Sequence, residues 1–402
     1  MTAAHPGPAH GCPVRRAGIA LLSVCVLAGC SSPAGAEGKP LPPINPTDFH
    51  HGAADPSGGA DGRVSVSTVA RHLDVPWGLS FLPDGSALVT ERRTLRILHV
   101  TTAGAVTPVA RIGEANSDNE GGLLGIAVSP GYKKDRTVYI YYTTKVDNRI
   151  ARLKLDGRAR PQPIVTGIPR GGIHDGGRLA FGPDGYLYAT TGEASRTEAA
   201  QRLDILGGKI LRMTTDGRPP PGNPFPRSLV WSYGHRNPEG LAWDAAGVMY
   251  SSEIGQAVWD ELNIIRPGGD YGWPAVEGIG SNPRYVDPVV VWHPEVGVAA
   301  GVAITGTTAV VTCLRGQRIY LVPLGPSPVV ASSFSDTAAV RWRTGSGVAG
   351  RPVEALTERY GRLRTAATAP DGSVWMTTSN RDGRNPNGPV PDDDRVLRLT
   401  LR

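Results

Sequence analysis

The sequence predicts an all-β protein folded as a six-bladed β-propeller, and two observations support this prediction. First, a short turn motif, Pro-Asp-Gly or a degenerate form of it, recurs between apolar, strand-like segments. Its copies begin near residues 81, 127, 181, 242, 303 and 368. Intervals of roughly 45 to 65 residues match one four-stranded blade with its loops. Second, 52 glycines and 36 prolines with only 19% charged residues indicate many turns and few long helices.

The residues before the predicted propeller have the features of an export signal. Arg15 and Arg16 form a basic start, residues 17–28 are apolar, and Leu-Ala-Gly-Cys follows at 27–30. This pattern resembles a bacterial lipobox. Residues 1–29 are therefore predicted to be a lipoprotein signal peptide, with Cys30 as the lipidated residue. The alternative is a plain secretory signal cut nearby, which would leave the protein without the anchor.

Residues 30–63 are predicted to be a flexible tether, because Pro, Gly, Ser and Ala dominate and hydrophobic periodicity is absent. Removal of residues 1–29 takes away two arginines and lowers the formal charge from +6 to +4. So small and scattered a surplus gives little support to nucleic-acid binding. No other run approaches the ~20 apolar residues that a membrane span requires. The predicted location is the outer face of a bacterial cell membrane, held by the lipid anchor only.

Each copy of the turn motif is typical of a β-hairpin, since Pro presets φ and Asp-Gly forms a tight turn between alternating strands. In chain order the copies are Phe81–Thr90, Ala127–Tyr142, Phe181–Ala189, Ala242–Tyr250, Ala303–Val311 and Thr368–Met376. Six hairpins at this period indicate six blades in residues 64–402, closed into a ring without a long free edge. A β-sandwich with repeated turns is the alternative, but it does not explain the regular period. Thr197–Leu206 is the only modest helical candidate.

Polar, glycine-rich segments lie between these hairpins. They are residues 119–125, 171–178, 231–274, 314–318 and 362–364. Loops from successive blades converge at the axis of a propeller, so these segments are predicted to form one site. The longest of them combines guanidinium, amide and carboxylate groups with glycines at the ends of short strands.

Four motifs in these segments carry a family resemblance. They read HDGGRLAFGPDGYLYATTGE, LGGKILRM, SYGHRNPEGLAW and DELNIIRPGGDYGWP, in this order. Together they resemble the soluble quinoprotein sugar dehydrogenases, the glucose/sorbosone dehydrogenase-like propellers that use pyrroloquinoline quinone (PQQ) and calcium. The resemblance spans about residues 68–400 and agrees with the six-blade prediction.

The resemblance implies roles for several residues. His174 matches the histidine that takes the hydroxyl proton, and Arg236 with Asn237 matches the pair that lies against the quinone. Further cofactor contacts are implied at four positions: Glu120, Arg315, Arg362 and Arg364. A pocket for a tricarboxylate needs several cations, and on a strand Arg362 and Arg364 would share one face. Arg315 stands where the family commonly has lysine.

The resemblance also implies a calcium site that polarises the quinone. Backbone carbonyls of Gly255 and Gln256 match the Gly-Pro pair that binds calcium in the family, with Gln256 in place of proline. Asp260 and Glu261 match nearby carboxylates, and the carbonyl of Tyr271 joins them. The alternative for both carboxylates is hydrogen bonding that stiffens the loop.

The function implied is a quinoprotein oxidoreductase that oxidises a CH–OH group of an aldose or related polyol. Its partners are a sugar or polyol substrate and an external electron acceptor. The first alternative is a non-catalytic cell-surface propeller, favoured by Glu120 and Glu239, which stand where glutamine is frequent in active members. The second is a metal-dependent lactonase, which the arginine-rich loops disfavour.

Overall fold

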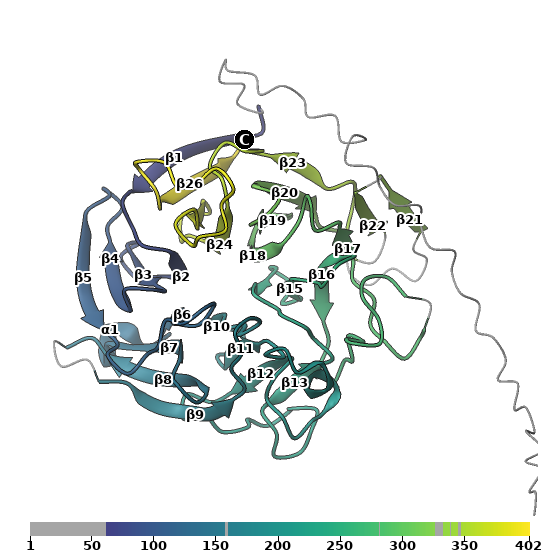
Figure 1. Ribbon diagram of the computed structural model, residues 1–402, viewed down its shortest axis with the longest axis horizontal. Helices are drawn as coiled ribbons and strands as arrows, with labels where there is room; N and C mark the ends of the chain where they lie inside the picture. Colours follow the sequence, from purple (N-terminus) through teal and green to yellow (C-terminus); the bar gives the residue numbers. More distant parts are fainter. Residues whose placement is uncertain (1–61, 157–159, 281, 326–332, 338, 345–346) are drawn as a thin grey trace, which may run out of the picture. The chain divides into compact units, whose positions relative to one another are not determined.

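A computed structural model describes residues 62–156, 160–280, 282–325, 333–337, 339–344 and 347–402. The predicted signal peptide, Cys30 and nearly all of the predicted tether lie outside these residues. Within them, six antiparallel sheets form a ring around a central axis (Figure 1). The predicted six-bladed β-propeller is confirmed.

The two inner strands of each blade come from the six predicted hairpins. They are β2 (Pro76–Phe81) and β3 (Ala87–Glu91), β6 (Leu123–Val128) and β7 (Thr137–Thr143), β10 (Leu179–Phe181) and β11 (Leu187–Thr191), β14 (Ala242–Trp243) and β15 (Met249–Glu253), β18 (Ala299–Thr305) and β19 (Thr308–Cys313), and β24 (Leu363–Thr368) and β25 (Val374–Thr378). In the hairpin of β10 and β11, Asp184 accepts the Tyr186 N–H and Gly185 has a φ of 78°. The turn chemistry is therefore the one that the motif predicts.

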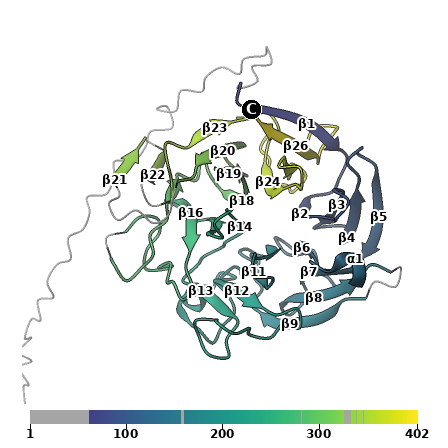
Figure 2. The ribbon, with the colours of Figure 1, turned by 180° about the vertical axis from the view of Figure 1, so that it is seen from behind.

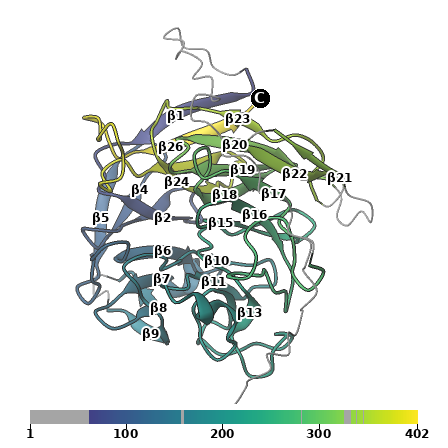
Figure 3. The same ribbon diagram turned by 45° about the vertical axis from the view of Figure 1, so that its right-hand side comes forward.

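The outer strands complete the blades. They are β4 (Arg96–Val100) and β5 (Val106–Arg111), β8 (Asn148–Lys154) and β9 (Gln162–Ile168), β12 (Lys209–Met213) and β13 (Val230–Tyr233), β16 (Asp260–Ile265) and β17 (Val290–Trp292), β20 (Arg318–Pro323) and β23 (Val353–Ala355), and β26 (Val396–Leu401) with β1 (Val64–Ala70). The last pair joins the two ends of the propeller, because β1 is hydrogen-bonded to β26 (Figure 3).

One blade is wider than the sequence predicts. The chain between β20 and β23 forms a hairpin, β21 (Ser333–Asp336) and β22 (Val340–Thr344), and β22 pairs with β17 of the preceding blade. Both strands lie at the outer rim of the ring (Figure 2). The fourth sheet therefore has six strands.

Helices are minor elements of the described residues. The predicted helix over Thr197–Leu206 is only a 3-10 turn, η2 (Thr197–Gln201), and a four-residue helix, α1 (Tyr132–Asp135), lies inside the second hairpin. Neither these nor any other described helix has the length and apolarity of a membrane span.

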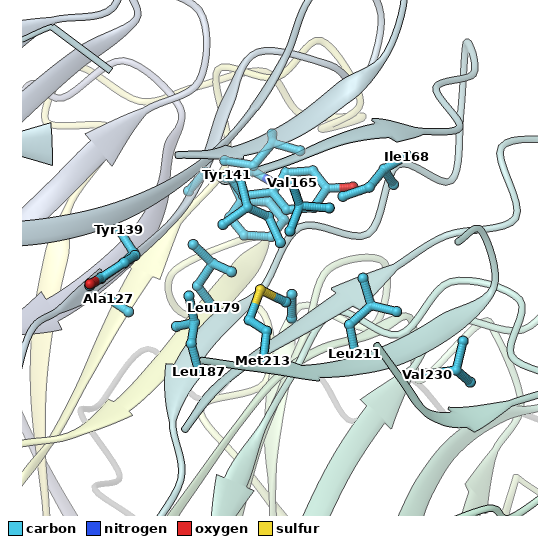
Figure 4. Packing of buried hydrophobic residues seen from close by; sticks show 14 residues of the cluster. Ala127, Tyr139, Tyr141, Val165, Ile168, Leu179, Leu187, Leu211, Met213 and Val230 are labelled. Carbon is cyan, nitrogen blue, oxygen red and sulfur yellow. The ribbon is translucent and has the colours of Figure 1, made fainter. Parts of the chain in front are cut away.

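Apolar side chains from neighbouring blades form the core. A cluster of 14 buried residues lies mainly between the second and third blades and includes Tyr141, Leu179 and Met213 (Figure 4). Within it the Tyr141 hydroxyl donates to the Asp175 carbonyl at 2.9 Å, which fixes one of the polar segments to the core.

The LGGKILRM segment contains a fully buried lysine on β12. Lys209 Nζ donates to the carbonyls of Ala199, Ala200 and Gly207 at 2.7, 2.9 and 2.7 Å. Burial lowers the pKa of Lys209 to about 7. This side chain holds the η2 segment against the third blade, so the motif has a structural role.

Candidate active site

The polar segments meet at one end of the propeller axis. Most of the predicted residues lie in segments that lead into the innermost strand of a blade: Glu120 before β6, His174 before β10, Arg236 and Asn237 before β14, and Arg362 before β24. In an antiparallel hairpin, the start of the first strand and the end of the second strand lie at the same end, opposite the turn. Segments that follow β3, β11, β19 and β25 therefore reach the same end of the propeller axis. The site is built from both kinds of segment.

His174 is held by a buried carboxylate from the segment that follows β11 of its own blade. Its Nδ1 is hydrogen-bonded to Glu193 Oε1, and the Glu193 side chain is only 1% exposed. Because an ionised carboxylate can only accept, Nδ1 carries the proton and Nε2 is left able to accept one. The His174 backbone has a φ of 63°, a left-handed conformation that is uncommon for this residue. His174 and Glu193 thus form a base oriented by a carboxylate.

A glycine makes this close approach possible. A Cβ added at Gly192 would lie 1.9 Å from the His174 carbonyl oxygen and 2.7 Å from the Asn237 side chain. Only glycine fits beneath the histidine at this position.

Glu120 connects His174 to the last blade. Its Oε2 accepts the His174 backbone N–H at 2.8 Å, and its Oε1 accepts Arg384 Nη1 at 2.5 Å. Burial alone would raise the pKa of Glu120, but the charge and hydrogen bond of Arg384 outweigh it and lower the pKa. The predicted cofactor contact is therefore an ionised residue that is already paired.

Arg236 lies on the other side of the site. Its backbone N–H donates to Glu253 at 2.5 Å, and its Nη1 donates to the carbonyls of Ile254, at 3.0 Å, and Gly255. The guanidinium carbon lies 5.5 Å from the centre of the Trp273 ring. Arg236 Nε is buried and has no hydrogen-bond partner among the described residues.

Asn237 joins two segments of the site. Its Oδ1 accepts the Gly176 N–H at 3.0 Å, and its Nδ2 donates to Glu239 Oε1 at 3.2 Å. The side-chain amide is thus engaged by the protein itself. Its role in this structure is to fix the segment of His174 to that of Arg236.

Arg362 lies just before β24 and Arg364 lies on it, where the pairing with β25 is irregular. Arg362 Nη2 lies 3.0 Å from Asp382 Oδ2, and Arg364 Nη1 lies 2.7 Å from Glu239 Oε2. All four side chains are less than 10% exposed. Both cations are therefore present at the axis, and each has a carboxylate partner from another segment.

The floor of the site is a polar hollow. It is lined by Trp77, Arg92, Glu120, Asp175, Gly176, Glu239 and Arg364. Arg178 lies 4.4 Å over the Trp77 ring, and burial lowers its pKa to about 10. Burial raises the pKa of Asp175 to about 6. Two arginines and three carboxylates thus line the hollow, and four of these five residues are buried.

Arg315 is placed differently from the other predicted cations. Its side chain is 56% exposed and lies 2.5 Å from Glu295. It does not line the axial hollow. The structure therefore does not group Arg315 with Arg362 and Arg364.

Three of the residues predicted for calcium, Gly255, Glu261 and Tyr271, line one hollow with Glu253 and Glu277, whereas Asp260 does not line it. Asp260 and Glu261 are consecutive on β16, so their side chains leave opposite faces of the strand. Asp260 accepts the backbone N–H groups of Gly255, at 2.9 Å, and Val298, which stiffens the loop as the alternative interpretation predicts.

Glu261 and the Gly255 carbonyl also have protein partners, whereas Gln256 and Tyr271 are held through atoms other than their predicted carbonyl ligands. Glu261 accepts the Gly278 N–H at 2.7 Å, and the Gly255 carbonyl accepts from Arg236. Gln256 donates its N–H to Glu277 at 2.7 Å, and the Tyr271 ring is buried with its hydroxyl donating to Ile264 at 2.7 Å. Side chains alone therefore offer no calcium site, because no group of three or more Asp, Glu, His or Cys side chains that could hold a metal ion occurs among the described residues.

An anionic cofactor fits the site better. Around the axis, three buried guanidinium nitrogens have no hydrogen-bond partner among the described residues: Arg92 Nε, Arg178 Nη2 and Arg236 Nε. Buried donors without partners are rare and costly, so their presence indicates that a ligand with acceptor atoms belongs here. The carboxylates and quinone oxygens of PQQ are such acceptors.

Several functional residues were missed by reasoning from the sequence. Glu193, Arg92, Asp382 and Arg384 all follow the second strand of a blade, whereas mainly the segments before the first strand were considered. Because the end of the second strand lies beside the start of the first in a hairpin, the segments after the second strands could also have been predicted to reach the site. Glu193 follows its predicted hairpin Phe181–Ala189 within a few residues.

Comparisons with known proteins agree with this geometry. A protein-family model described as Glucose / Sorbosone dehydrogenase matches residues 73–386. The structure is similar to a PQQ-bound aldose sugar dehydrogenase from Streptomyces coelicolor, with 43% identity, a TM-score of 0.76, and coverage of 85% of this chain and 99% of that one.

Two further relatives show the same pattern. A putative oxidoreductase (glucose dehydrogenase) from Thermus thermophilus is 41% identical, with a TM-score of 0.73 and coverage of 84% of this chain and 100% of that one. An aldose sugar dehydrogenase of Escherichia coli is 28% identical over 81% of this chain and 92% of its own length.

Proposed function

The chain belongs to the glucose/sorbosone dehydrogenase family, and on that premise we propose that it is a PQQ-dependent oxidoreductase acting on a CH–OH group of an aldose or related polyol. One observation carries the proposal. His174, oriented by Glu193, shares the axial site with buried guanidinium donors that lack partners among the described residues. A base beside unpaired cations is what the oxidation of an alcohol by an anionic cofactor requires.

The roles of the residues follow from their contacts. His174 Nε2 accepts the proton of the substrate hydroxyl, while the Glu193 carboxylate stabilises the imidazolium that forms. PQQ, when bound, supplies the two-electron acceptor for the hydride. Arg236 offers its free Nε–H to negative charge that develops next to it. Arg362 and Arg364 would hold carboxylates of the cofactor.

The test is titration of the purified, cofactor-free protein with PQQ, in the presence of calcium and in the presence of a chelator. Dye reduction is followed with a panel of aldoses. Saturable activity that is lost in His174→Ala supports the proposal. A matched control is His99→Ala, because His99 bonds Ser86 at 2.8 Å on an outer strand, away from the site. If PQQ binds neither in the presence of calcium nor in the presence of a chelator, the proposed function is refuted.

A non-catalytic binding module is the second candidate. The observation in its favour is that Arg362, Arg364 and Arg384 already have carboxylate partners within the chain. Such a protein would keep its fold and bind no PQQ. A metal-dependent lactonase has less support, because the axial carboxylates Glu120 and Glu239 are engaged by arginines.

The proposal also includes an exported, lipid-anchored protein that delivers electrons to an external acceptor. It is supported by the lipobox-like sequence at 27–30. Cys30→Ser should release the protein from the membrane fraction and abolish incorporation of labelled palmitate. Unchanged fractionation of the variant would contradict the anchor.

A further inference from the structure

The carboxylate of Glu239 forms an ion pair with Arg364, one of the two arginines that would bind the cofactor's carboxylates. Glu239 Oε2 lies 2.7 Å from Arg364 Nη1, and both side chains are less than 10% exposed. The pair joins the segment before β14 to the segment of β24, 125 positions apart in the chain. In the cofactor-free protein, Glu239 therefore fixes the position of Arg364.

The surroundings of Glu239 are crowded with charge. Arg178 donates its Nε to the Glu239 carbonyl at 2.7 Å, and Asn237 donates to its Oε1 at 3.2 Å. The titratable and charged groups that face the same hollow from the other segments are Arg92, Glu120, Asp175, Arg178 and Arg364. Together with Glu239, this set has three arginines and three carboxylates in the absence of a ligand.

A tricarboxylate changes that balance. When it binds Arg364, Glu239 shares its guanidinium partner with a second carboxylate in a region from which water is excluded. Two carboxylates at one site disfavour the ionisation of both. Glu239 is the carboxylate that would share the Arg364 guanidinium with the ligand, and burial already raises its pKa, so we expect this residue to take up the proton.

We propose that Glu239 is a positioning residue that holds Arg364 in the cofactor-free protein and takes up a proton when PQQ binds. The inference rests on the proposed function. Glutamine at this position would hold Arg364 without a charge, so the proton requirement is a property of the glutamate. Cofactor loading then becomes weaker as the pH rises.

The test is calorimetric titration of the purified full chain with PQQ in two buffers that differ in ionisation enthalpy. Between the pKa of Glu239 in the free protein and its higher pKa in the complex, we expect uptake of about one proton per PQQ and a dissociation constant that rises about tenfold per pH unit. In Glu239→Gln the uptake should fall to near zero and the affinity should become independent of pH. These readouts measure binding and do not depend on turnover.

Two further variants distinguish the source of the proton. Asp175→Asn, in the same hollow, and Glu354→Gln, whose residue pairs with Arg318 outside it, should both retain the uptake. Loss of uptake in Asp175→Asn with retention in Glu239→Gln would overturn the inference. If Glu239→Gln does not fold, the wild-type protein decides: PQQ binding without pH dependence overturns it as well.

The two proposals fail in different ways. PQQ binding without proton uptake refutes the role of Glu239 and leaves the proposed function standing. No PQQ binding by either the wild type or Glu239→Gln refutes the proposed function, and the role of Glu239 with it.

Discussion

Replacement of Glu193 by glutamine tests the orientation of the base directly. The Glu193 side chain is 1% exposed and its Oε1 accepts from His174 Nδ1, while its Oε2 has no partner among the described residues. Glutamine keeps the shape and one acceptor oxygen but removes the negative charge. The imidazolium formed when His174 takes a proton then loses its counter-ion.

The size of the effect follows from the burial of the pair. A hydrogen bond to a charged group contributes about 1.5–3 kcal/mol, and about 1.4 kcal/mol corresponds to tenfold in rate. We therefore expect kcat to fall about 10- to 150-fold in Glu193→Gln, because the charge forms only during reaction. The KM for sugar and the affinity for PQQ should change little.

The assay is steady-state dye reduction at saturating PQQ, with kcat and KM determined separately. Glu198→Gln provides the control, since Glu198 is an exposed carboxylate on the nearby η2 turn. A kcat within twofold of wild type in Glu193→Gln, together with loss of activity in His174→Ala, would refute the role assigned to Glu193.

Three other predictions concern the fold and the site. Gly192→Ala should remove activity and lower stability by about 1–3 kcal/mol, because the new Cβ collides with the His174 carbonyl oxygen; normal activity with unchanged thermal unfolding would contradict this. Lys209→Met should lower the free energy of unfolding by about 2–4 kcal/mol in urea titrations, since three buried carbonyls lose their donor; a change below about 1 kcal/mol would count against it. The pKa of Asp175 is raised by burial to about 6, so the folded state binds this proton more tightly than the unfolded state and stability falls as the pH rises from about 4 to 6. Asp175→Asn should therefore gain stability over wild type at pH 7 but not at pH 4, and an equal difference at both pH values would refute the assignment.

Much of the fold could be predicted because its repeat is local. The Pro-Asp-Gly turns at Asp84, Asp184 and Asp371 each start a hairpin, and their spacing sets the number of blades. The hairpin of β21 and β22 could not be foreseen, since its pairing with β17 depends on contacts between different blades. The helix expected over Thr197–Leu206 is only a 3-10 turn, Thr197–Gln201. Lys209 donates to a carbonyl of this turn, a contact that the sequence pattern did not predict.

The family resemblance predicted several of the residues that lie at the site. It did not predict their hydrogen-bond and ion-pair partners. His174, Arg362 and Arg364 lie at the axis as expected. Arg364 pairs with Glu239, and the Asn237 amide contacts Gly176 and Glu239. The pairing of Arg364 and the contact with Gly176 join segments that are far apart in the chain. Asp260 and Glu261 show the opposite case, because their adjacency on β16 was enough to separate their side chains.

The pairing of β1 with β26 also determines the order in which the protein can be completed. Val64 pairs with Leu401, so the first described strand to be synthesised finds its partner only when the last one has been made. Contacts of such separation form slowly, and until β26 is made, β1 has no partner strand and can pair with other chains. Deletion of β1 or truncation within β26 should therefore leave five blades folded beside an incomplete sixth.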